Sequence, residues 1–192
     1  MDDREYTERL LRLQTARWKK LLHVQAPYGW NLRRLAPGFT LEIGCGIGRN
    51  LLQMGGTGVG TDTNPYSVAV CRERGLTAFT PAEFAVSEYA APGRFDSILL
   101  SHVAEHMTHA QLVALLREHV PFLRKNGRVI LIAPQEVGYR SDVTHVEFMD
   151  FEKLEQVLAE VGFGRERSYS FPFPRWAGKL FVYNEFVVVG AR

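Results

Sequence analysis

The sequence predicts an α/β fold: a doubly wound, mostly parallel seven-stranded sheet with helices on both faces and an antiparallel C-terminal hairpin. Short apolar runs alternate with helical patterns from residue 39 to residue 162, and glycine, proline or asparagine interrupts the chain between them. Because parallel strands need a crossover that is usually a helix, this alternation favours a parallel sheet covered on both faces. Two β-rich stretches, 165–171 and 179–191, then follow closely enough to pair with each other.

The N-terminal part is predicted to be helical. Apolar residues recur at helical spacing between residues 3 and 24, which indicates an amphipathic helix. Pro27 and Gly29 are expected to interrupt it, and residues 30–35 to form a second short helix.

The strands and helices of the core follow from local signals. Strands are expected at 39–43, 57–61, 76–79, 95–101 and 127–133. Asn64 is a good N-cap for a helix that begins at Pro65, and Thr108 with Gln111 forms a capping box for a helix over 108–123. The other helices are expected from about residue 50 and over 150–162, the second after a loop that follows the last of these strands.

Composition limits the class of protein. The chain has 192 residues, of which 46% are hydrophobic and 23% charged, so we expect one domain with a helical cap over 1–37 and an α/β core over 38–192. The net charge of +2 gives no overall basic field that nucleic acid would require. Two cysteines form no disulfide framework. With no signal peptide and no apolar run of about 20 residues, we expect a cytoplasmic protein with no membrane partner.

The run LEIGCGIGRN, residues 41–50, places three glycines at alternate positions directly after a predicted strand. Such a cluster indicates a sharp turn or the close approach of a ligand. Glu42 would repel a pyrophosphate but attract an ammonium group, and Asp62 closes the next strand, where a carboxylate accepts hydrogen bonds from ribose hydroxyls. The pattern suits a nucleoside with a cationic amino-acid tail, as in S-adenosylmethionine. A structural turn, or a NAD-binding turn with unusual spacing, is the alternative.

Over residues 39–162 the sequence resembles the class I, Rossmann-like S-adenosylmethionine-dependent methyltransferases, with LEIGCGIGRN, GVGTDTN, FDSILLSHVAEHM and LRKNGRVILIAPQ in family order. The resemblance implies an enzyme whose glycine turn holds the methionine half, Asp62 the ribose and residues 81–83 the adenine. The residues that it assigns to the cofactor are Glu42, Gly44, Cys45, Gly46, Gly48, Asn50, Asp62, Thr63, Asn64, Ala82, Glu83, Ser101 and His102. A regulatory subunit without catalysis and a NAD-dependent oxidoreductase are alternatives from other classes.

A second group of polar residues follows the fourth predicted strand. SHVAEHM places His102, Glu105 and His106 at spacings that share one side of a helical turn. His145 lies in the loop after the fifth strand, and both loops open at the carboxyl edge of the sheet. Two or three imidazoles and a carboxylate make a competent divalent-metal site.

This arrangement is similar to two metal-using subgroups, the small-RNA 3′-terminal 2′-O-methyltransferases and the ubiquinone-biosynthesis O-methyltransferases. The resemblance implies metal ligation by His102, Glu105, His106 and His145, with the last three as catalytic residues. His102 stands where the first subgroup has a carboxylate, and more imidazole shifts the preference from Mg²⁺ towards Zn²⁺, Mn²⁺ or Fe²⁺. The alternative is a metal-free methyltransferase in which a neutral histidine is the general base.

The expected acceptor is a hydroxyl of a small polyhydroxylated molecule, such as a sugar or a saccharide end. A cation with open positions would chelate neighbouring hydroxyls, and Arg175 with Trp176 could form a stacking wall. A metal-free O- or N-methyltransferase of small molecules, or a 2′-O-methyltransferase of an RNA 3′ end, is the alternative, the latter favoured by basic residues near the start of the chain. The short chain also suggests a homodimer that completes the acceptor site.

Overall fold

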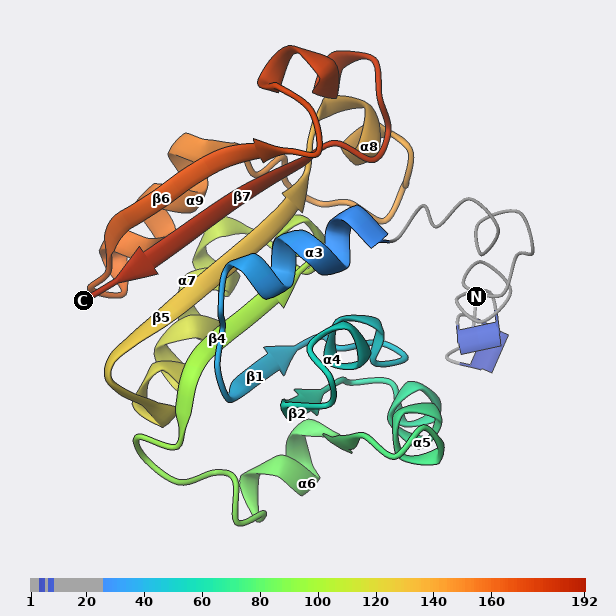
Figure 1. The fold of residues 1–192 in the computed structure, drawn as a ribbon, viewed down its shortest axis with the longest axis vertical. Coiled ribbons are helices and arrows are strands. Elements are labelled where there is room, and N and C mark those ends of the chain that lie inside the picture. Colours follow the sequence, from blue (N-terminus) through green and yellow to red (C-terminus); the bar gives the residue numbers. More distant parts are fainter. Residues whose placement is uncertain (1–3, 6, 9–25) are drawn as a thin grey trace. The chain divides into compact units, whose positions relative to one another are not determined.

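The computed structural model describes residues 4–5, 7–8 and 26–192, and the chain divides into two compact units, Met1–Ala90 and Ala91–Arg192 (Figure 1). The first contains α3 (Ala26–Arg34), β1 (Thr40–Ile43), α4 (Arg49–Gln53), β2 (Gly58–Thr61), α5 (Pro65–Glu73), β3 (Thr77–Phe79) and α6 (Pro81–Ala85). The second contains β4 (Phe95–Ser101), the 3₁₀ turn η1 (Ala104–His106), α7 (His109–His119), η2 (Val120–Phe122), β5 (Leu123–Pro134), α8 (Glu136–Arg140), α9 (Phe151–Glu160), β6 (Gly164–Phe171), η3 (Arg175–Lys179) and β7 (Glu185–Ala191).

The strands of the first unit are parallel and lie in the order β3-β2-β1. Every residue of β1 and of β2 is buried, as expected of strands covered on both faces. Parallel pairing brings the carboxyl ends of β1 and β2 to the same edge, where Ile43 lies opposite Thr61. The glycine turn and Asp62 therefore start from adjacent strand ends.

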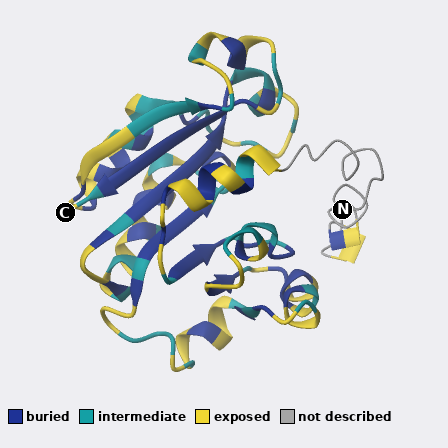
Figure 2. Ribbon diagram, viewed as in Figure 1, coloured by how far each residue is buried: buried dark blue, intermediate teal, exposed yellow. Residues whose placement is uncertain are grey.

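The strands of the second unit lie in the order β4-β5-β7-β6. β4 and β5 are parallel, whereas β7 is antiparallel to both of its neighbours. Figure 2 shows β5 and β7 buried along most of their length, and α9 packs on β6, β7 and α7. The expected α/β class, with seven strands and an antiparallel C-terminal pair, is confirmed.

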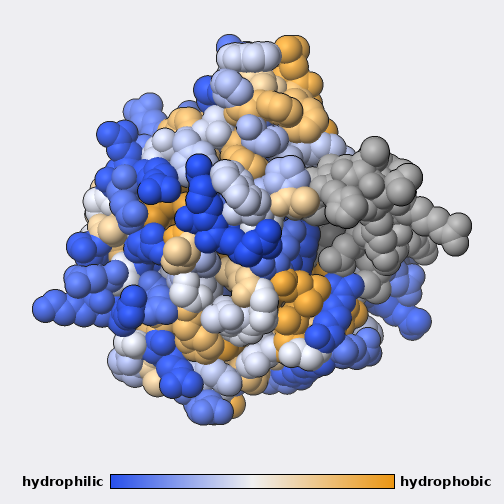
Figure 3. All heavy atoms as spheres, in the orientation of Figure 1, coloured by the Kyte–Doolittle hydropathy of each residue, from blue (hydrophilic) through white to orange (hydrophobic). Residues whose placement is uncertain are grey.

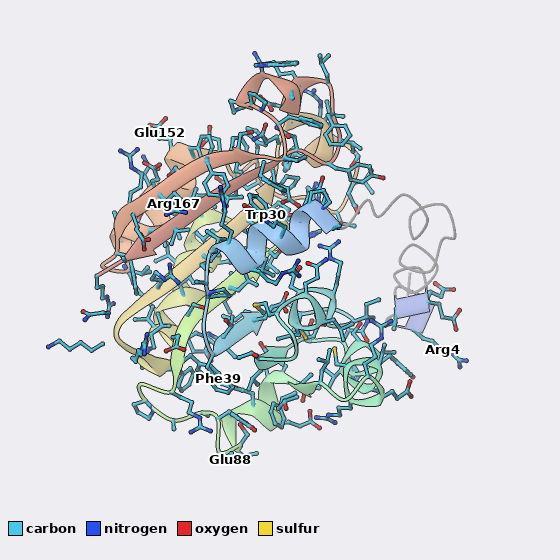
Figure 4. The ribbon with its side chains drawn as sticks, viewed as in Figure 1. Arg4, Trp30, Phe39, Glu88, Glu152 and Arg167 are labelled. Carbon is cyan, nitrogen blue, oxygen red and sulfur yellow. The ribbon has the colours of Figure 1, made fainter. Side chains whose placement is uncertain are left out.

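The edge strand β6 carries charged side chains. Residues 164–167, Gly-Arg-Glu-Arg, are exposed, and Figure 4 labels Arg167 there and Glu152 on α9. Charges on an edge strand oppose pairing with another chain, which explains why this strand has no apolar alternation.

The predicted helix caps are confirmed. The Asn64 side chain accepts hydrogen bonds from the backbone of Tyr66 and Ser67 at the start of α5. Thr108 and Gln111 form both halves of a capping box on α7, and Asp150 caps α9. These short-range signals fixed the helix starts because each satisfies an otherwise unpaired amide.

Four features differ from the prediction. Pro27 and Gly29 lie inside α3, because proline is tolerated in the first turn of a helix. α7 ends at His119, since Pro121 diverts the chain into η2. Residues 179–184 are not strand, and β7 begins only at Glu185. The short helices α6 and α8 were not predicted. The helix expected over 3–24 lies largely outside the described residues.

Gly60 in β2 leaves the space into which Cys45 of the glycine turn packs. A Cβ atom at Gly60 would lie 2.6 Å from Cys45 Sγ and 2.9 Å from Leu51 Cδ1. We therefore expect Gly60→Ala to lower the free energy of unfolding by about 1–3 kcal/mol, measured by urea denaturation. Gly164→Ala is the matched control, because the nearest atom to its Cβ is 3.8 Å away. An unchanged midpoint for Gly60→Ala would contradict this reading of the packing.

Among the described residues, no helix combines the length and apolar character that crossing a bilayer requires.

Candidate functional site

The glycine turn after β1 is held by the end of β2. The amides of Gly44 and Cys45 both donate to the carbonyl oxygen of Thr61, at 2.8 and 3.0 Å. Gly44, Gly46 and Gly48 have φ angles of 72°, 52° and 76°, the left-handed region in which a side chain is strained. At Gly48 a Cβ would also collide with Leu76, so packing as well as backbone conformation requires glycine there.

Glu42 is a buried carboxylate at the start of this turn, with 1% of its surface exposed. Its Oε1 accepts a hydrogen bond of 2.7 Å from Asn50 Nδ2, whereas no described residue donates to Oε2. Burial raises the pKa of Glu42 to about 8, against the smaller lowering effect of Asn50. A buried carboxylate oxygen without a donor is costly, and a cationic ligand group would satisfy it.

Asp62 ties the glycine turn to the end of β2. Its Oδ2 accepts from the amide of Gly46 at 2.7 Å, and its Oδ1 from the amide of Asn64 at 2.9 Å. Each carboxylate oxygen has two lone-pair sites, so acceptor capacity remains for hydroxyl groups. Of its predicted neighbours in the site, Thr63 is exposed and Asn64 is buried as the cap of α5.

Two residues predicted near the adenine lie on the exposed surface of α6. Ala82 has no role besides the predicted adenine contact. Glu83 completes a capping box with Thr80 and accepts a hydrogen bond from Arg72 at 2.9 Å. Hydrogen bonds from Thr80 and Arg72 lower the pKa of Glu83 to about 2. One oxygen of Glu83, Oε2, accepts all of these bonds, so its contribution to an adenine site stays a prediction.

Cys45 is a buried packing residue of the turn. Cys45 and Cys71 both direct their thiols at the Gly46 carbonyl, at 3.6 and 3.2 Å, and both belong to one apolar cluster with Leu51. The hydrogen bond between the two thiols, together with burial, raises the pKa of Cys45. The Cys45 side chain therefore stabilises the glycine turn by packing in this apolar cluster.

In the second unit, three of the four predicted metal ligands, Glu105, His106 and His145, lie close together. Their ligand atoms all lie within 4.8 Å of one another. Two hydrogen bonds anchor the His145 loop to η1: the amides of Val146 and Glu147 donate to the Glu105 carbonyl oxygen at 2.7 and 3.2 Å. Residues about 40 positions apart in the chain are thus held at one place by backbone contacts, independently of the side chains.

Both histidines of this cluster have one ring nitrogen directed at a backbone carbonyl. His145 Nδ1 lies 2.6 Å from the Tyr139 carbonyl oxygen, and His106 Nδ1 lies 3.4 Å from that of Thr144. A carbonyl accepts only, so Nδ1 of His145 donates, and Nε2 is the ring nitrogen that can offer a lone pair. The Tyr139 ring also stacks on His145 at 5.2 Å. This is the arrangement of a metal-ligating or proton-accepting imidazole.

Glu105 is 1% exposed, and neither of its carboxylate oxygens has a hydrogen-bond donor within the described part of the chain. Two ring nitrogens lie near Oε1, His102 Nδ1 at 3.4 Å and His145 Nε2 at 4.0 Å. A cation bound at about 2.1 Å from each ligand would require the three ligand atoms to close by about 1 Å. The donor set of two imidazoles and a carboxylate fits a divalent cation.

His102 is placed differently from the other three predicted ligands. It has a φ of 58°, unusual for a residue with a side chain, and its Nε2 lies 2.8 Å from Oε1 of Glu185. Desolvation lowers the pKa of His102, but the carboxylates of Glu105 and Glu185 beside its two ring nitrogens outweigh this effect and raise the pKa to about 10. The structure therefore brings three predicted ligands together and directs His102 to a second carboxylate. Ser101, the last residue of β4, is half-buried beside it.

Glu185 and Tyr139 are site residues that the sequence interpretation missed. Glu185 is the first residue of β7, opposite Pro134 at the end of β5. An acidic residue at the start of an otherwise apolar strand can be recognised in the sequence. That it belongs to the site follows only from the antiparallel pairing of β7 with β5. Tyr139 lies in α8, a helix too short for a periodic pattern.

The segment between β6 and β7 carries exposed apolar side chains. Trp176 and Leu180 are 67% and 78% exposed, and apolar spheres gather at the upper end of Figure 3, where this segment lies in Figure 1. Arg175, the other residue of the predicted stacking wall, pairs with Glu136 through contacts of 2.6 and 2.8 Å. Trp176 is thus exposed in the second unit, whereas Arg175 is paired with the opposite charge of Glu136.

Comparison with protein families identifies residues 41–131 as matching a methyltransferase domain. The matched range includes the glycine turn, Asp62 and the Glu105-His106 pair, but not His145. A search of curated protein sequences finds no match.

Solved structures share the fold at low sequence identity. A SAM-dependent methyltransferase from Archaeoglobus fulgidus aligns with a TM-score of 0.66 at 17% identity, covering 90% of this chain and 99% of that one. Magnesium protoporphyrin IX methyltransferase from Synechocystis PCC 6803, with bound SAH, gives 0.62 at 14%, covering 88% and 84%. The 1,6-didemethyltoxoflavin-N1-methyltransferase of Burkholderia thailandensis, with its substrate and S-adenosylhomocysteine, gives 0.62 at 16%, covering 100% and 91%.

Proposed function

We propose that this chain is an S-adenosylmethionine-dependent methyltransferase that methylates a hydroxyl group of a small polyhydroxylated acceptor, such as a sugar or a saccharide end, with the assistance of a divalent cation. The observation that carries the proposal is Glu105, a buried carboxylate with no hydrogen-bond donor among the described residues, beside two histidines whose ligand atoms lie within 4.8 Å of it. His102 Nδ1 lies 3.4 Å from one of these oxygens without a hydrogen bond, so a cation bound at the carboxylate would supply the missing partner.

The cofactor half of the proposal depends on Glu42 and Asp62. Glu42 Oε2 has no donor among the described residues and would accept from the ammonium group of S-adenosylmethionine. Asp62 retains lone pairs for the ribose hydroxyls while it holds the Gly46 amide. These residues fit a ligand with a cationic amino-acid tail and a ribose, and a pyrophosphate would be repelled by Glu42.

The acceptor half depends on the Glu105, His106 and His145 cluster, which would hold the cation. When bound, a divalent cation supplies positive charge that favours the deprotonated form of a neighbouring hydroxyl. The Tyr139 carbonyl orients the His145 ring, and the amides of Val146 and Glu147 hold the backbone of Glu105 beside it. The sulfonium is already electrophilic, so these residues have only to expose an oxygen lone pair about 3–3.5 Å from the methyl carbon.

The choice of a polyhydroxylated acceptor follows from chelation and stacking. Three protein ligands leave coordination positions that two neighbouring hydroxyls could fill. Exposed Trp176 offers a flat apolar face, and sugar rings stack on such faces. The near-neutral net charge of +2 provides few phosphate contacts, which disfavours a long RNA.

Chelation tests the metal-dependent version directly. We expect EDTA to reduce methylation of a diol panel (sugars, catechols, terminal ribosides) to about 1% or less, and Mn²⁺ or Zn²⁺ to restore it. Transfer of the labelled methyl group from S-adenosylmethionine is the measurement. Full activity after chelation would contradict metal assistance and leave His145 as a general base, the second candidate mechanism, which its free Nε2 favours.

A further inference from the structure

The surroundings of His102 differ from those of a metal ligand. Both of its ring nitrogens face carboxylates: Nδ1 lies 3.4 Å from Glu105 Oε1, and Nε2 lies 2.8 Å from Glu185 Oε1. A ring that is bounded by two acceptors has no lone pair to offer a cation. By contrast, His145 has Nδ1 on the Tyr139 carbonyl oxygen, and its Nε2 lies 4.0 Å from Glu105 Oε1, beyond hydrogen-bond distance.

Backbone strain at His102 indicates that this orientation is enforced. A φ of 58° lies in the left-handed region, where a residue with a side chain is strained. The His102 amide donates to the Ile132 carbonyl at 2.9 Å, which fixes the turn at the end of β4. Strained residues of this kind persist where the surrounding structure supports them, and they cluster at functional sites.

Glu185 is held in place by strand pairing and by buried side chains. It is 8% exposed and lies at the start of β7, where its backbone carbonyl accepts from the buried Gln135 side chain at 2.9 Å. Gln135 in turn accepts from Asn184 Nδ2 at 3.0 Å. Strand pairing and this buried network hold the Glu185 backbone in place, and its Oε1 meets His102 Nε2 at 2.8 Å.

We infer that Glu185 and His102 are positioning residues, not metal ligands: Glu185 orients His102, and His102 holds Glu105 with a carboxylate oxygen directed at the cation. The inference rests on the proposed metal site and deepens it. The cation then has three protein ligands, Glu105, His106 and His145. His102 stands where the small-RNA methyltransferases carry a carboxylate, but it does not coordinate the cation. Groups that orient a ligand in this way commonly alter metal affinity by about 10- to 100-fold.

The experiment measures Mn²⁺ affinity of the full chain by electron paramagnetic resonance of the free ion. We expect Glu185→Ala to weaken binding about 10- to 100-fold and Glu185→Gln, whose amide oxygen can still accept from His102, to weaken it less. Glu160→Ala is the matched control, because His109 Nε2 contacts Glu160 Oε1 at the same 2.8 Å on other helices. Thermal melting without metal separates loss of affinity from loss of folding.

A second measurement counts the imidazole ligands. Electron spin echo modulation of bound Cu²⁺ is expected to show two imidazoles in the wild type and in His102→Gln, and one in His145→Gln. Three imidazoles in the wild type, or unchanged Mn²⁺ affinity in both Glu185 variants, would overturn the inference and leave the proposed function intact. No Mn²⁺ or Cu²⁺ binding by the wild type would overturn the metal site and the inference together.

Discussion

Replacing His145 with glutamine is expected to abolish measurable Mn²⁺ binding and to lower turnover by about 100-fold or more, with S-adenosylhomocysteine affinity unchanged. The His145 side chain is 9% exposed, its Nδ1 donates to the Tyr139 carbonyl, and its Nε2 faces Glu105 at 4.0 Å. Glutamine can keep the hydrogen bond to Tyr139 but offers no nitrogen lone pair. Calorimetry measures the affinity for S-adenosylhomocysteine, and electron paramagnetic resonance measures the affinity for Mn²⁺.

The matched control for this variant is His119→Gln. His119 in α7 also directs Nδ1 at a backbone carbonyl, that of Leu115 at 2.8 Å, and packs edge-on against the Phe122 ring. Its loss changes the same type of contact away from the Glu105 cluster, so metal affinity and turnover should stay at the wild-type level. If His145→Gln binds Mn²⁺ as tightly as His119→Gln does, His145 is no ligand and the proposed site fails.

Local signals made most of the fold predictable. The β4 run from Phe95 to Ser101 is found as predicted, because a strand buried on both faces is a continuous apolar run. Asn64, Thr108 and Asp150 marked helix starts, since a cap needs only residues within one turn. The residues of β7 were harder to bound: aromatic residues in 179–184 are as typical of a strand as of the turn that they form.

The parts of the site that could not be predicted depend on contacts between distant segments. Sequence spacing alone predicts that His102 lies near Glu105. The left-handed backbone of His102 and its contact with Glu185, 83 residues away, depend on the pairing of β7 with β5. The same holds for Glu83, whose carboxylate is engaged by Arg72 from a different helix. Sequence patterns thus identify which residue types gather at a strand end, whereas tertiary contacts decide which atoms remain available.

Glu42→Gln is expected to remove the pH dependence of S-adenosylhomocysteine binding as well as most of the affinity. Burial raises the pKa of Glu42 from 4.5 to about 8 in the folded chain. Between these values the folded state binds more protons than the unfolded state, so the contribution of this group to stability falls as pH rises from 4.5 to about 8. An ammonium group favours the ionised carboxylate, so ligand binding releases a proton from Glu42.

The affinity of the wild type should therefore rise with pH, by at most about tenfold per unit below pH 8, and level off above it. Calorimetry at several pH values, in buffers of different ionisation enthalpy, measures both the affinity and the released proton. Glu88→Gln, an exposed acid in the same unit, is the control that should keep the wild-type slope.

The amide substitution separates charge from hydrogen bonding at this position. Glutamine retains an oxygen that can accept from Asn50, as Glu42 Oε1 does at 2.7 Å, so the glycine turn should keep its support. What glutamine lacks is an oxygen that can become negative, and Oε2 is the atom without a donor among the described residues. A variant that binds S-adenosylhomocysteine with the wild-type slope and proton release would therefore exclude Glu42 as the partner of the ammonium group, whatever the role of Asp62.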